Sequence, residues 1–233
     1  MVVHKYGGWA MQNSVSREEV CHRIIDAVKE GKKVVAVISA MGRAGDPYAT
    51  DTLLQLTEWE EDSKEVHLVK SCGEFIASAV LTALLKTHDI ACELMYGLDA
   101  GIYGSDGDIQ VDLSAIEKRL TQVDAIIVPG FQYLTEAGHF QTLGRGGSDF
   151  SALLYAQHLG CQAIFFKDVP GVYYPASSQT LVSSLTHAQL AECDVIQKRA
   201  AHYAALHHIP IEIRSYTLNS EGTVIRSPLP EIQ

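Results

Sequence analysis

The segment Thr142–Asp149 carries one cation, one hydroxyl and one carboxylate in a glycine-rich turn, before a helix-prone run from Phe150 to Leu159. Glycines let backbone N–H groups approach a ligand, and a helix N-terminus favours negative charge. Arg145 can bind a carboxylate or phosphate through two parallel hydrogen bonds, and Asp149 can bind an ammonium group or a metal. The segment predicts a site for a small anionic or zwitterionic ligand. Taken alone, it also fits a glycine turn with Ser148 as helix N-cap.

Two further glycine loops follow strand-like runs. The first is Lys5-Tyr-Gly-Gly8, and the second is Ser39-Ala-Met-Gly42 with Gly45 close behind. Because the carboxyl ends of parallel strands open at one sheet edge, we expect both loops and Lys5 to form a cradle for a triphosphate. Neither loop has the spacing of a P-loop, and the first lacks Gly-x-Gly-x-x-Gly. A P-loop NTPase is therefore excluded, and a dinucleotide-binding domain is disfavoured.

Another carboxylate stands in Ser71-Cys-Gly-Glu74, ahead of a helical run from Phe75 to Lys86. We expect the tetrapeptide to open that helix, so that the helix dipole stabilises Glu74 in the first turn. In isolation this pattern is ordinary helix-start chemistry.

Alternating strands and helices are needed to position these loops. Ser16 and Glu19 predict a capping box for a helix that ends at Gly31. Phe131–Thr135 and His139–Thr142 predict an antiparallel hairpin. The pattern is typical of a single three-layer α/β domain over residues 1–233, with ligands at the carboxyl ends of the strands. The β-rich runs are Val2–Lys5, Lys33–Ser39, Ala91–Met95, Ala125–Val128, Ala163–Lys167 and Ile209–Ile213.

Composition limits the partners. A net charge of −10 over 233 residues disfavours nucleic acid, which needs clustered Lys and Arg. No stretch approaches the roughly 18 apolar residues of a membrane span, and the chain opens with strand-like sequence, not a signal peptide. The five scattered cysteines look like reduced thiols. We therefore expect a cytoplasmic protein without a membrane partner, and a solvated loop at the charge run Glu58–Asp62.

Six motifs occur along nearly the whole chain: Lys5–Gly8, Val34–Gly42, Ser71–Glu74, Gly144–Asp149, Phe166–Val172 and Ile209–Ser215. In order and spacing they resemble the catalytic domain of aspartate kinase, a member of the amino acid kinase family. The resemblance implies an αβα sandwich around a mostly parallel sheet. It also implies transfer of the γ-phosphoryl group of ATP to the side-chain carboxylate of aspartate, with Mg²⁺ bridging the phosphates, in lysine, threonine and methionine biosynthesis.

The resemblance also implies a role for each site residue. Lys5 contacts the transferring phosphoryl group, and Asp149 is the second catalytic residue. Glu74 binds the aspartate ammonium group and Arg145 its α-carboxylate, while Ser39 and Ser148 complete the substrate pocket. No side chain is assigned to a metal, and the family's habit of pairing kinase domains implies a homodimer. The nucleotide is held by Lys5, Gly7, Gly8, Gly42, Lys167, Asp168 and Tyr173.

Departures from the family pattern fall mainly on the nucleotide side. Trp9-Ala10 stands where the family has Thr-Ser, Lys167-Asp168 replaces Thr-Asp, and the family's Asp-Pro-Arg is missing after Tyr173. The lysine that approaches ATP aligns with Asp194, although Lys167 or Lys198 can compensate for its charge.

Two alternative readings stay open because of these departures. One is a weak or silent aspartokinase homologue that acts as an amino-acid-binding or regulatory protein, and the other is an amino acid kinase with a different acceptor. The family's last kinase-domain strand aligns with Glu221–Ile225, close to Gln233, so the C-terminal regulatory domains of most aspartate kinases are not expected in these residues. Either the sequence is a piece of a longer protein, or the native protein lacks that mode of feedback.

Overall fold

An eight-stranded sheet forms the centre of the computed structural model, which describes residues 1–57, 62–105, 107–175, 177, 180–217 and 219–227. The strand order is β12-β14-β13-β9-β1-β2-β6-β3, and neighbours are parallel except β13 and β14. The strands are β1 (Val2–Tyr6), β2 (Val34–Ile38), β3 (Cys92–Leu94), β6 (Ala125–Pro129), β9 (Ala163–Lys167), β12 (Ser184–Leu185), β13 (Ile211–Ser215) and β14 (Thr223–Ile225).

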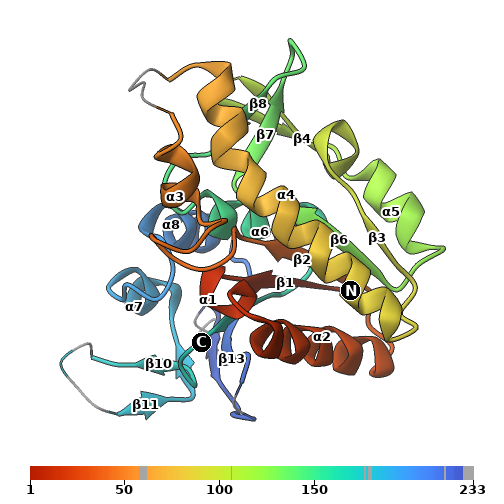
Figure 1. Cartoon of the computed structure of the whole chain (residues 1–233). Coiled ribbons are helices and arrows are strands. Elements are labelled where there is room, and N and C mark those ends of the chain that lie inside the picture. Colours follow the sequence, from red (N-terminus) through yellow and green to blue (C-terminus); the bar gives the residue numbers. More distant parts are fainter. Residues whose placement is uncertain (58–61, 106, 176, 178–179, 218, 228–233) are drawn as a thin grey trace.

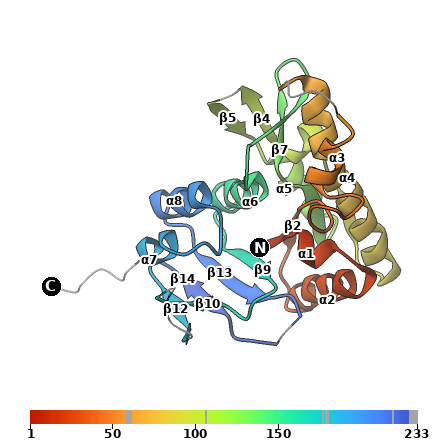
Figure 2. The same ribbon diagram turned by 60° about the vertical axis from the view of Figure 1, so that its left-hand side comes forward.

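Helices cover both faces of this sheet, as Figure 2 shows. In β2, Val34, Ala36 and Ile38 join the apolar core under α2 (Ser14–Lys29) and α4 (Lys64–Thr87). Val35 and Val37 join the core under α5 (Ser114–Leu120), α6 (Gly147–His158) and α8 (Lys198–Leu206). Strands buried on both faces read as continuous apolar runs, which is why the sequence predicts them well. The three-layer αβα sandwich around a mostly parallel sheet is confirmed.

A four-stranded sheet in the order β5-β4-β7-β8 stands beside the upper part of α4 (Figure 1). The predicted hairpin is confirmed as antiparallel β7 (Gln132–Thr135) and β8 (Phe140–Thr142). The sequence analysis missed β4 (Ile102–Ser105) and β5 (Asp108–Val111). The remaining elements are α1 (Gly8–Met11), α3 (Thr50–Leu54), η1 (Gly97–Ala100), α7 (His187–Ala191) and the ribbon of β10 (Val172–Tyr173) and β11 (Leu181–Val182).

The predicted starts of two helices are wrong. The N-cap of α2 is Asn13, whose side chain accepts a hydrogen bond from the Ser16 amide, so Ser16 is the third helical residue and not the N-cap. Ser16 completes a capping box, because its Oγ accepts a hydrogen bond from the Asn13 amide. The N-cap of α4 is Ser63, which accepts from the Val66 amide. Glu74 therefore lies in the middle of α4, and the helix dipole does not account for its state. The predicted loop Glu58–Asp62 falls largely on residues 58–61, outside the described residues.

Among the described helices, α4 is long and apolar enough by length and composition to cross a membrane. In this fold α4 packs against α2, α3, β3, β6 and β8. Its buried face also carries His67, Ser71 and Glu74. These contacts make α4 a layer helix of the domain, and its Glu74 faces the site described below.

Candidate active site

The loops after β1, β2 and β9 and the start of α6 surround a cavity of about 670 Å³, a size typical of small-ligand sites. The structure brings all but one of the predicted site residues to this cavity. The exception is Tyr173, which lies on β10, outside the lining, with 41% of its surface exposed. The predicted residues that line the cavity are Lys5, Gly7, Gly8, Ser39, Gly42, Glu74, Arg145, Ser148, Asp149, Lys167 and Asp168.

Two lysines flank one buried carboxylate at the base of the cavity. Lys5 Nζ lies 2.7 Å from Asp149 Oδ1, and Lys167 Nζ lies 3.8 Å from Asp149 Oδ2. Burial alone would raise the pKa of Asp149, but Lys5, Lys167 and a hydrogen bond from the Gln197 amide lower it to about 2. Burial lowers the pKa of Lys167 to about 8, and Asp149 opposes that shift. Two cations beside one anion leave net positive charge, which suits a phosphate group.

A second buried carboxylate faces the same cavity from α4. Glu74 is 3% exposed, and its Oε1 accepts a hydrogen bond of 3.1 Å from the Ala40 amide. Its Oε2 has no hydrogen-bond partner among the described residues. Burial raises the pKa of Glu74 to about 8, against the lowering effect of the Ala40 hydrogen bond and of Lys5. A buried carboxyl with one unsatisfied oxygen is suited to a cationic group of a ligand.

Close backbone packing explains two of the glycines. The Gly42 amide donates to the Gly8 carbonyl over 2.9 Å, and a Cβ on Gly8 would lie 2.3 Å from the Gly42 oxygen. A Cβ on Gly73 would lie 2.6 Å from the carbonyl oxygen of Tyr48. Glycine thus lets the two glycine loops touch, and it lets α4 bring Glu74 against the loop after β2.

The glycine-rich turn ends in a backbone cap for α6. The N-cap is Gly146, so the alternative of Ser148 as N-cap is wrong. Glycine is favoured at this position because its φ is 71° and because a Cβ there would lie 2.2 Å from Cγ of Gln197. Ser148 Oγ lies 2.9 Å from Ser39 Oγ instead. Asp149 falls in the first turn of α6, and Arg145 is exposed at the rim of the cavity. Here the sequence analysis predicted the residues but not the cap.

Several side chains that line the cavity were not predicted as site residues, among them Lys70, Arg43 and Trp9. Lys70 lines it from α4, one turn before Glu74. The Arg43 guanidinium lies 5.5 Å from the centre of the Trp9 ring, and both residues line the cavity. The Lys70–Glu74 spacing of four residues is a helical signal, but the wrong start of α4 concealed it.

A smaller cavity of about 370 Å³ adjoins this site, and Asp149 and Lys167 line both. Asp194, just before α8, and Lys198, the first residue of α8, also line it. Asp194, where the resemblance implies a lysine, therefore shares this cavity with the two cations Lys167 and Lys198.

Comparison with known proteins agrees with this geometry. The model of the amino acid kinase family matches residues 1–215. The chain therefore belongs to the amino acid kinase family. It is 35% identical to Aspartokinase 1 of Bacillus subtilis, covering 97% of this chain and 61% of that protein, so it spans about three fifths of that relative's length.

Two solved structures are also similar. The crystal structure of aspartate kinase from Synechocystis has a TM-score of 0.83 and 28% identity, covering 98% of this chain and 40% of that one. E. coli aspartokinase III in complex with aspartate and ADP has a TM-score of 0.78 and 19% identity, covering 99% of this chain and 65% of that one. The second match, at this identity, concerns the fold.

Proposed function

We propose that residues 1–233 form a single amino acid kinase domain that phosphorylates the side-chain carboxylate of aspartate with ATP. One observation carries the proposal: the Lys5–Asp149–Lys167 cluster and the buried Glu74 open into the same cavity. The first suits a transferring phosphoryl group and the second an ammonium group. The similarity to named aspartokinases supports the same acceptor.

In this proposal the aspartate zwitterion lies between two anchors. Glu74, once ionised, receives the ammonium group, and Arg145 at the rim receives the α-carboxylate through two parallel hydrogen bonds. Ser39 and Ser148 complete the substrate pocket. The side-chain carboxylate is then free to point toward Lys5.

The chemical step needs positioning and charge more than proton transfer. An oxygen of the aspartate side chain, already ionised, forms a bond to the γ-phosphorus, and the bond from that phosphorus to the β–γ bridging oxygen breaks to release ADP. Lys5 stabilises negative charge on the transferring group, and Asp149 holds Lys5 in place. The two glycine loops at Gly7–Gly8 and Gly42 offer backbone amides to the phosphates.

ATP enters this site as its Mg²⁺ complex. Asp149 is already engaged with two lysines, so the ion is assigned to the phosphates and no side chain is assigned to it. Lys167, Lys198 and Asp168 lie on the nucleotide side, and the two cations offset Asp194. Tyr173 is assigned to the outer edge of the nucleotide, since it lies outside the cavity lining.

We also propose a cytoplasmic homodimer, as in the family. Light scattering that gives only a 25.4 kDa species would contradict the dimer.

The test combines hydroxylamine trapping of the acyl phosphate, run with Mg-ATP and aspartate or glutamate, with a coupled assay for ADP, which also detects transfer to a nucleoside monophosphate. Aspartyl hydroxamate, formed together with ADP, supports the proposal. If ADP is released only with an acceptor other than aspartate, the protein is a kinase of different specificity. Calorimetric binding of aspartate without any hydroxamate or ADP would establish a silent homologue.

A further inference from the structure

A cluster of metal-binding side chain types lies away from the cavity, where α2 meets the end of α4. Donor atoms of Glu18, Cys21 and His88 all lie within 4.8 Å of one another. Glu18 Oε2 is 2.9 Å from His88 Nε2. None of these residues lines the active-site cavity, and the proposed reaction does not use them.

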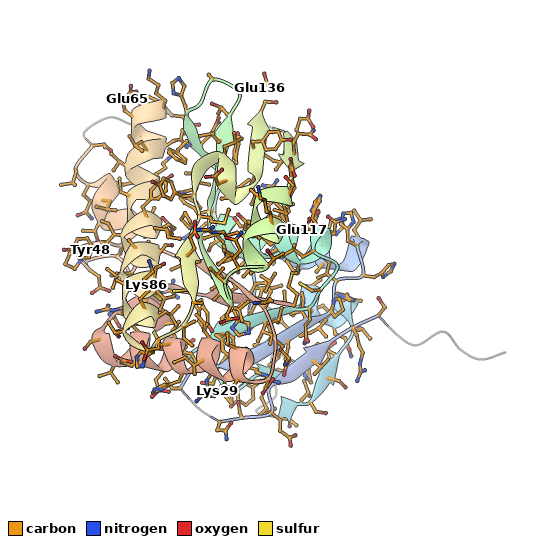
Figure 3. The ribbon with its side chains drawn as sticks, turned by 90° about the vertical axis from the view of Figure 1, so that its right-hand side faces the viewer. Lys29, Tyr48, Glu65, Lys86, Glu117 and Glu136 are labelled. Atoms are coloured by element: carbon orange, nitrogen blue, oxygen red, sulfur yellow. The ribbon has the colours of Figure 1, made fainter. Side chains whose placement is uncertain are left out.

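Helix geometry explains the cluster. Glu18, Cys21 and His22 stand at positions i, i+3 and i+4 of α2, so their side chains share one side of that helix. His88 is the C-cap of α4. Its ring centre lies 6.2 Å from that of His22, which brings a second imidazole to the same place. In Figure 3, α4 runs down from Glu65 and meets α2 on the part of that helix away from Lys29.

The donor set selects a class of ion. A thiolate, an imidazole and a carboxylate together are ligands that zinc accepts, whereas Mg²⁺ and Ca²⁺ prefer oxygen alone. Ligand atoms bound to one zinc ion at about 2.0–2.3 Å lie roughly 3.5 Å apart in a tetrahedron. The separations of up to 4.8 Å therefore need only small side-chain movements. His22 can supply the fourth ligand by turning toward His88.

The exposure of the cluster and the ionisation of Cys21 are also compatible with a bound metal ion. Cys21 is fully buried, while the side chains of Glu18 and His88 are 43% and 32% exposed, so an ion can enter from the surface. Burial, together with the nearby Glu18 carboxylate, raises the pKa of the Cys21 thiol to about 12. Without an ion Cys21 is a thiol, and the incoming ion displaces its proton to solvent.

We propose that Glu18, Cys21, His22 and His88 bind one zinc-class divalent cation that fixes α2 to the C-terminal end of α4. The site is structural. It joins two helices of one layer, and the proposal does not depend on which reaction the cavity performs.

The test uses the full chain, purified with a chelator and a non-thiol reductant, and titrated with Co²⁺ and then Zn²⁺. We expect one equivalent of Co²⁺ to give tetrahedral d–d bands and a thiolate charge-transfer band, and Zn²⁺ to displace it. Cys21→Ser should remove the charge-transfer band, and His88→Gln should weaken Zn²⁺ binding by about tenfold or more. Zn²⁺ should raise the melting temperature of the wild type but not of His88→Gln.

The matched control is the double variant Cys72→Ser/His202→Gln, which removes one thiol and one exposed imidazole elsewhere. It should bind Co²⁺ and Zn²⁺ like the wild type. If Cys21→Ser does not fold, the variants Glu18→Gln and His88→Gln, whose side chains are partly exposed, test the site instead. The proposal would be overturned if the wild type did not bind Zn²⁺, or if Glu18→Gln and His88→Gln bound Zn²⁺ as strongly as the wild type does.

Discussion

Lys5 and Asp149 form a buried ion pair of 2.7 Å, although Lys5 lies in β1 and Asp149 lies in the first turn of α6, in the second half of the chain. The pair links the glycine loop after β1 to the glycine turn before α6. Asp149 also lies 3.8 Å from Lys167, so one carboxylate aligns two cations at the base of the cavity. The position of the Lys5 ammonium group, which we propose stabilises the phosphoryl group, therefore depends on α6 as much as on β1.

Lys5→Met is expected to lower kcat by about 10²–10³-fold, because it removes a preorganised cation from the developing charge of the transition state. The measurement is the steady-state rate of ADP release at saturating Mg-ATP and aspartate. Lys33→Met, a partly exposed lysine just before β2 and outside the cavity, serves as control and should keep the wild-type rate. A Lys5→Met rate within a few-fold of the wild type would show that this lysine does not contact the reacting group.

Glu74 is expected to make aspartate binding pH-dependent. Its pKa is raised to about 8 in the ligand-free protein, so near pH 7 most molecules must lose this proton before they bind an ammonium group. Affinity for aspartate should rise by up to about tenfold per pH unit as the pH increases toward 8, and then level off. Calorimetry in two buffers of different ionisation enthalpy measures the proton release. Glu74→Gln should bind weakly with little pH dependence; an unchanged profile would contradict the assignment.

The same group should affect stability. The unfolded chain releases the Glu74 proton near pH 4.5, whereas the folded chain holds it until about pH 8. The folded state binds more protons between these values, so the Glu74 contribution to the free energy of unfolding falls as the pH rises across this window. Glu74→Gln should remove that fall, as urea unfolding at pH 5, 6.5 and 8 would reveal. Parallel stability profiles for the two proteins would count against a raised pKa.

Arg145→Ala is expected to raise KM for aspartate by about tenfold to a hundredfold with a smaller effect on kcat, because a bidentate carboxylate contact is lost. Arg145 is exposed at the rim, so solvent can partly replace that contact. Arg119→Ala, on α5 and outside the cavity, is the control. A large fall in kcat at unchanged KM would instead place Arg145 on the phosphate side.

Asp194→Lys is expected to tighten Mg-ATP binding by about threefold to tenfold at low salt, since it replaces an exposed anion at the smaller cavity by a cation. The gain should shrink as ionic strength rises. Asp26→Lys, on the exposed side of α2, makes the same charge change elsewhere and should leave affinity unaltered. Equal Mg-ATP affinity for wild type and Asp194→Lys would mean that position 194 does not face the nucleotide.

The sequence by itself determined the layers and the loops. Apolar runs such as Val34–Ile38 and the glycines at the ends of β1 and β2 are local signals, because strand burial on both faces and close backbone approach each restrict the residue types allowed. For that reason the three-layer fold could be predicted from the sequence, and all but one of the predicted site residues line the cavity. The strands β4 and β5, each four residues long, lack such a run and were missed.

Tertiary structure decided how the groups act on one another. The true start of α4 at Lys64 places Glu74 in mid-helix, and packing against the loop after β2 buries it and raises its pKa. The Lys5–Asp149 pair and the gathering of Cys21 with His88 join residues far apart in the chain. Burial and long-range pairing depend on how strands and helices pack in space. They therefore cannot be predicted from a local pattern of residue types.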